Sequence, residues 1–178
     1  MSRGTLLNQI DRESQPMMLK QTAFGAITGA LLLIAFIFYV VAQADPSYGV
    51  AKVGSITVGA TGLWSDNLVE NCNGDTACNK IKAARAFFVM ATIVAFIAGV
   101  LLLYITFKAT YPKVLYLASV ALALAAFLFG LIGWAIGMSQ FVRSPWTMGA
   151  ASALGLIGWI FCLIALVLAV LMREHTLI

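Results

Sequence analysis

Four long apolar segments constrain this chain more than any other feature of its sequence. They cover residues Thr22–Ala42, Ala84–Phe107, Val114–Gly137 and Thr147–Met172. A transmembrane helix needs about 20 consecutive, mainly apolar residues, and each segment reaches that length. With 62% hydrophobic and only 10% charged residues, the chain carries more apolar surface than a soluble protein of its size can bury. We therefore predict one membrane domain, an all-α bundle of four transmembrane helices.

The polar segments between the spans predict the topology. Positive charges divide six against five between the two sides, so the positive-inside rule gives only a weak orientation. Cys72 and Cys78 share the longest connection, residues 43–83. Disulfides persist in oxidising compartments, so a bridge between these cysteines predicts that the connection is extracellular, and two free thiols are the alternative. The predicted cytoplasmic segments are 1–21, 108–113 and 173–178, and the predicted second extracellular loop is 138–146.

The long extracellular connection is predicted to fold as a small antiparallel β-sheet. The sequence VAKVGSITVG (50–59) has short runs of Val, Ile and Thr broken by glycines, which is typical of a strand, a tight turn and a second strand. The sequences LVENC and CNKI predict two further short strands around the turn in NGDTA. A Cys72–Cys78 disulfide would pin that hairpin and stabilise it by about 2 kcal/mol. We expect Tyr48 and Trp64 at the level of the lipid headgroups.

Glycines within the spans are placed for close helix packing. Helices in lipid associate where small residues let their backbones approach each other. The predicted packing residues are Gly25, Gly29, Gly133, Gly137 and Gly155. Self-association through one of these faces is the alternative to packing within a monomeric bundle. No acidic residue lies in any of the four spans, which disfavours a pump or a pore through the bundle because buried charges mark such paths.

The first extracellular loop carries Gly62, Leu63 and Trp64, followed by Cys72 and Cys78. In a four-span chain this motif resembles the superfamily of claudins, peripheral myelin protein and epithelial membrane proteins. That superfamily also contains the calcium-channel gamma subunits and the AMPA-receptor auxiliary proteins. The resemblance covers nearly the whole chain and implies a claudin-like fold, a four-helix bundle that bears a disulfide-pinned extracellular sheet.

Three further segments extend the resemblance, and the spacing of the motif departs from it. One of them, MGAAS followed by GLIGW (148–159), resembles the fourth claudin span. The sequence AARA, with Arg85, is similar to the opening of the second claudin span, and QFVRSP resembles the second claudin loop. Seven residues separate Trp64 from Cys72, where claudins have two. The segment from Cys78 to Arg85 has room for one short strand and not for the extracellular helix of claudins, which disfavours a tight-junction barrier.

The sequence offers little for catalysis, metals or nucleic acids. Its single histidine, His175, lies three residues from the end, and no His, Cys and carboxylate cluster has metal-ligand spacing. No basic run is interleaved with aromatic residues as in nucleic-acid binding. The first twenty residues are polar and lack the apolar core of a signal peptide. We predict no catalytic residue, no metal, no cofactor and no nucleic-acid partner.

The functional hypotheses share one scaffold. The leading hypothesis is a non-enzymatic plasma-membrane protein that organises membrane-protein assemblies or cell-cell contacts. The alternatives are an auxiliary subunit of an ion channel or receptor, and a paracellular barrier or pore. The expected partners are lipids and other integral membrane proteins. Thr176 and Ile178 fit the terminal pattern that PDZ domains bind, and a frayed end without a partner is the alternative.

Overall fold

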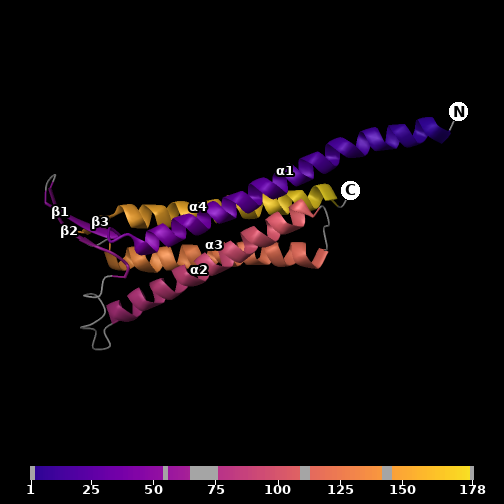
Figure 1. The fold of residues 1–178 in the computed structure, drawn as a ribbon. Coiled ribbons are helices and arrows are strands. Elements are labelled where there is room, and N and C mark those ends of the chain that lie inside the picture. Colours follow the sequence, from indigo (N-terminus) through magenta and orange to yellow (C-terminus); the bar gives the residue numbers. More distant parts are fainter. Residues whose placement is uncertain (1–2, 54–55, 65–75, 109–112, 142–145, 177–178) are drawn as a thin grey trace.

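The computed structural model of the chain has seven elements within the residues that it describes (Figure 1). It describes residues 3–53, 56–64, 76–108, 113–141 and 146–176. The helices are α1 (Arg3–Ala44), α2 (Thr76–Phe107), α3 (Lys113–Phe141) and α4 (Ala150–Thr176). The strands are β1 (Gly49–Val53), β2 (Ile56–Thr61) and β3 (Trp146–Met148).

Each of these helices contains a segment long and apolar enough to cross a membrane, the architecture of a multi-pass membrane protein. The segments are Thr22–Ala44, Cys78–Phe107, Lys113–Gln140 and Ala150–Met172. The first three predicted spans lie inside these segments. The fourth was predicted to begin at Thr147, which is three residues too early because Thr147 belongs to β3.

The helices run up and down as a bundle, with both chain ends at the end opposite the sheet (Figure 1). Helix α1 packs against α2 and α4, and α3 packs against the same two helices. Small side chains face the interior, and Ala35, Ala95 and Ala126 are among the fully buried ones. Large apolar side chains such as Ile93, 53% exposed, face outward. This arrangement suits lipid, where helices gain by close backbone approach and not by hiding apolar surface.

Three buried aromatic rings fill the half of the bundle nearest the sheet. Tyr39 on α1, Tyr48 after α1 and Phe88 on α2 are fully buried. The Phe88 ring centroid lies 6.0 Å from that of Tyr39 and 6.2 Å from that of Tyr48, both in edge-to-face geometry. Tyr48 therefore lies in the core and not on the outer surface of the bundle. Its predicted level, at the lipid headgroups, stays a prediction.

The sheet has the strand order β2-β1-β3 and is antiparallel throughout. Strands β1 and β2 pair from Gly49 with Thr61 to Val53 with Ile56, so the two predicted strands in residues 50–59 match the structure. The predicted turn between them lies outside the described residues. Strand β3 pairs with the other edge of β1 and was not predicted.

The predicted strand CNKI (78–81) is wrong, since these residues are helical. Helix α2 begins at Thr76, inside the predicted loop 43–83. Alanine and lysine dominate TACNKIKAARA, and both residues favour helix over strand. The predicted strand LVENC (68–72) lies outside the described residues.

Candidate interaction site at the sheet end of the bundle

The Gly-Leu-Trp motif continues from β2 and turns back onto the bundle. Leu63 is fully buried, whereas Trp64 is 49% exposed. A Cβ atom on Gly62 would lie 2.7 Å from the Cα atom of Pro46, which is closer than side chains tolerate. Only glycine lets the motif pass this close to the end of the first helix.

Arg85 on α2 joins the motif to the bundle. Its Nε donates a hydrogen bond of 2.7 Å to the backbone carbonyl oxygen of Leu63. Its guanidinium carbon lies 5.0 Å from the centroid of the Trp64 ring, within the range of a cation–π interaction. The structure thus brings together the motif residues and the arginine, which lie 21 or more positions apart along the chain. We call Leu63, Trp64 and Arg85 the clamp.

A second attachment joins the sheet to α4. The backbone amide of Gly149 donates to the Tyr48 carbonyl over 3.1 Å, and that of Ala151 donates to the Ser47 carbonyl over 3.3 Å. A Cβ atom on Gly149 would collide with the Ser47 carbonyl oxygen. The Asp45 carboxylate accepts a 2.7 Å hydrogen bond from the backbone amide of Ser47 and so shapes this turn. The chain is therefore attached to the bundle at two places, after β2 through Arg85 and before β1 through these backbone hydrogen bonds.

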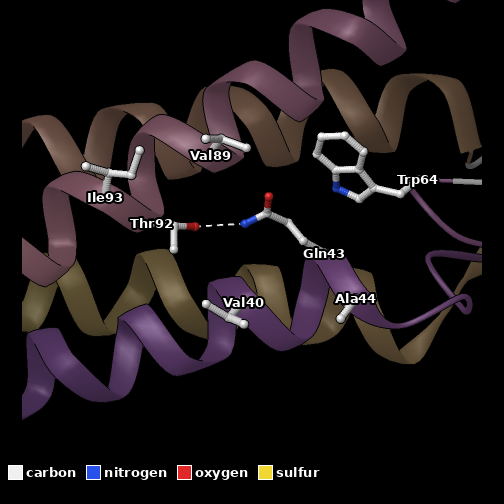
Figure 2. A pocket seen from close by; sticks show the side chains of 7 residues that line it. All are labelled: Val40, Gln43, Ala44, Trp64, Val89, Thr92 and Ile93. Carbon is white, nitrogen blue, oxygen red and sulfur yellow. Dashed lines mark hydrogen bonds between the residues drawn. The ribbon is translucent and has the colours of Figure 1, made fainter.

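Beneath Trp64 lies a groove between α1 and α2 with a volume of about 440 Å³ (Figure 2). Its lining consists of Val40, Gln43, Ala44, Trp64, Val89, Thr92 and Ile93. Gln43 Nε2 donates a 2.8 Å hydrogen bond to Thr92 Oγ1 across the groove. Sequence reasoning missed this pair, although Thr92 is a polar residue inside a predicted span and Gln43 directly follows another.

The edge strand β2 presents apolar side chains to the surroundings. Ile56 is 68% exposed and Val58 is 61% exposed. Val58 has no partner residue on β1, because the register of the two strands shifts between Ala51 and Lys52. We call Ile56 and Val58, the two exposed apolar side chains of this edge strand, the patch. The strands extend beyond the helix ends (Figure 1). An exposed apolar edge of this kind is a site for pairing with another chain.

The predicted packing glycines lie at helix contacts. An added Cβ on Gly29 would lie 3.3 Å from the Gly99 carbonyl oxygen on α2, and Gly99 was not predicted. A Cβ added on Gly137 would lie 2.5 Å from Tyr48 Oη, and one added on Gly155 would lie 3.1 Å from Phe88 Cζ. Likewise, Gly25 faces Thr106, and Gly133 faces Phe87 and Phe88.

Only part of the predicted disulfide lies within the described residues. Cys78 is buried at the start of α2, and Cys72 lies outside the described residues. Cys162 is a free thiol buried in α4. The bridge between Cys72 and Cys78 therefore stays a prediction.

The other residue types considered in the sequence, the C-terminal PDZ ligand and possible metal ligands, do not form a site within the described residues. Thr176 is the last residue of α4, and Ile178 lies outside the described residues. Within the described part of the chain, no group of three His, Cys, Asp or Glu side chains is placed to hold a metal ion. No protein-family model matches the chain, and no curated protein matches it.

Proposed function

We propose that the protein is a non-enzymatic membrane organiser of the claudin-like type, whose extracellular sheet engages a neighbouring membrane protein. The observation that carries this proposal is the exposed apolar patch of Ile56 and Val58 on the edge strand of a sheet that is clamped to the bundle. A patch that projects past the helix ends is poorly placed to rest against its own helices. It has the unpaired strand edge and the apolar side chains that β-strand addition by a partner requires.

The proposal places the sheet outside the cell and both termini in the cytoplasm. Cys72 and Cys78 support this orientation if they form the predicted disulfide, because disulfides persist in oxidising compartments. Cys162 is buried in the bundle, so Cys72 is the remaining partner for Cys78 within a chain of three cysteines. The plasma membrane is the expected location.

The clamp supports the proposal because it makes the sheet a rigid platform. A binding surface loses less conformational entropy when it is held in place before its partner arrives. Arg85 holds the chain that follows β2, and the backbone contacts to the start of α4 hold the chain that precedes β1, while the patch on β2 stays open. A movement of a partner bound at the patch would be transmitted to α2 and α4.

The experiment compares the wild-type protein with the double variant Ile56→Ser/Val58→Ser. Each is expressed in cells that lack junctions, and its enrichment at cell-cell contacts and its co-purifying membrane proteins in mild detergent are quantified. We expect the double variant to lose at least fivefold in contact enrichment or in recovery of a stoichiometric partner. Thr57→Ala is the matched control, because Thr57 is exposed on the same strand but is polar, and it should behave as wild type.

The identity of the recovered protein separates the functional hypotheses. Recovery of a channel or receptor subunit would establish the auxiliary-subunit alternative, and enrichment at contacts with changed transepithelial resistance would establish the barrier alternative. A wild-type protein that purifies alone and stains the membrane evenly would refute the proposed function.

A further inference from the structure

The groove between α1 and α2 contains one hydrogen-bond acceptor that faces its open space. Gln43 Nε2 donates to the Tyr39 carbonyl oxygen over 3.1 Å and to Thr92 Oγ1 over 2.8 Å. A backbone carbonyl accepts and never donates, so the amide nitrogen must point at Tyr39. The amide oxygen, Oε1, is then turned toward the groove (Figure 2). Among the described residues no donor reaches Gln43 Oε1.

The neighbouring hydroxyl cannot satisfy this oxygen. Thr92 Oγ1 donates its hydrogen to the Phe88 carbonyl oxygen over 2.7 Å and accepts from Gln43. A hydroxyl has a single hydrogen to donate. The polar pair therefore leaves Gln43 Oε1 able to accept a hydrogen bond from a donor that enters the groove.

The depth of the site restricts what the occupant is. Gln43 is the residue before the last one of the apolar segment Thr22–Ala44, and we take this end of the segment as the boundary between hydrocarbon and headgroups. Deeper in the membrane the groove is lined by Val40 and Ile93, which are 42% and 53% exposed on the outside of the bundle. The occupant needs one donor at the boundary and an apolar body that extends inward. Trp64 covers the upper end with an aromatic face (Figure 2).

We propose that this groove binds a sterol, with its hydroxyl group donating to Gln43 Oε1. A sterol has one hydroxyl at the headgroup boundary and a rigid apolar ring system below it. The glycerol esters of a diacyl phospholipid offer only acceptors at this depth. A transmembrane helix satisfies its backbone N–H groups internally and offers no donor except from a side chain. A volume of about 440 Å³ is within the usual range of small-molecule sites. This proposal goes beyond the proposed function and does not depend on it.

The test uses the purified full chain in phosphatidylcholine vesicles and a photoreactive diazirine analogue of cholesterol. Labelled peptides are located by mass spectrometry, and cholesterol and cholest-4-en-3-one are added as competitors. The ketone has the same apolar body but no hydroxyl to donate. We expect labelling on residues 37–44 or 85–97, and competition by cholesterol at a concentration at least fivefold lower than by the ketone. Equal competition by the two sterols would overturn the proposal.

Two variants test the site itself. Val89→Trp fills the groove with a larger side chain and should reduce labelling at least fivefold. Val100→Trp is the matched control, because Val100 is also an exposed valine of α2 but lies outside the groove lining, and it should label as wild type. Gln43→Met removes the acceptor and should abolish the preference for cholesterol over the ketone. Unchanged labelling of Val89→Trp, or an unchanged preference in Gln43→Met, would contradict the assignment.

Other occupants give different results in the same assay. Competition by sphingomyelin or added phosphatidylcholine as strong as that by cholesterol would show an ordinary lipid-facing surface and would refute sterol binding. A probe that labels the purified protein but not the protein in native membranes would show that a partner's helix covers the groove, and this result would also overturn the proposal.

Discussion

Replacing Arg85 by alanine should detach the sheet from α2. The substitution removes the hydrogen bond from Nε to the Leu63 carbonyl oxygen and the cation–π contact with Trp64. Hydrogen bonds from charged groups contribute about 1.5–3 kcal/mol. A cation–π contact with a half-exposed ring adds about 0.5–1 kcal/mol. The free energy of unfolding should therefore fall by about 2–4 kcal/mol, which lowers the ratio of folded to unfolded protein by a factor of roughly 30 to 1,000.

The assay is reversible unfolding of the purified protein in mixed micelles with increasing sodium dodecyl sulfate, followed by the fluorescence of the tryptophans. Lys82→Ala is the matched control, because Lys82 is an exposed cation on the same helix. Arg85→Lys should give an intermediate loss, because lysine keeps the positive charge but lacks the Nε–H donor and the planar group. If Arg85→Ala and Lys82→Ala unfold at the same detergent fraction, the clamp contributes no stability and the reasoning is wrong.

Two further predictions concern the sheet. Gly149→Ala should lower the unfolding midpoint and reduce the amount of protein at the cell surface, because its Cβ would collide with the Ser47 carbonyl oxygen. Gly59→Ala is the control, since its Cβ would lie 3.8 Å from the Trp146 side chain. Equal effects of the two substitutions would contradict this prediction. Replacing Cys72 and Cys78 by serine should leave four spans but cost about 2–3 kcal/mol and reduce the protein at the cell surface; wild-type surface levels of this variant would refute the predicted disulfide.

The spans were predictable from the sequence because a bilayer imposes a length and a composition on any helix that crosses it. Their ends were less predictable. Helix α2 begins at Thr76, eight residues before the predicted span, because helix propensity continues past the point where hydropathy falls. A hydropathy pattern locates the segment that crosses the membrane, but it does not locate the residue at which the helix begins or ends.

The sheet was only half predictable, for a different reason. Strands β1 and β2 are neighbours in sequence, and their pattern of β-branched residues and glycines is local. Strand β3 has three residues and pairs with β1 from nearly a hundred positions away. A segment this short has no pattern of its own, and its strand conformation depends on the edge of β1 that it meets.

The residues of the candidate site, too, were only partly predictable from the sequence. The resemblance singled out Trp64 and Arg85, and the structure brings them into contact. It did not single out Gln43 or Thr92, whose pairing depends on how α1 and α2 cross. Gly29 on α1 and Gly99 on α2 lie in contact with each other. The sequence pattern indicated Gly29 and not Gly99.

We propose that the clamped β-sheet stands on the extracellular side of a four-span bundle. This placement is tested most directly by cysteine accessibility in intact cells, with Thr57→Cys on β2 and Lys108→Cys at the opposite end of the bundle. Both positions are exposed. We expect a membrane-impermeant maleimide to label Thr57→Cys in intact cells, to label Lys108→Cys only after permeabilisation, and to leave the wild-type cysteines unlabelled. Labelling of Lys108→Cys but not of Thr57→Cys in intact cells would contradict it.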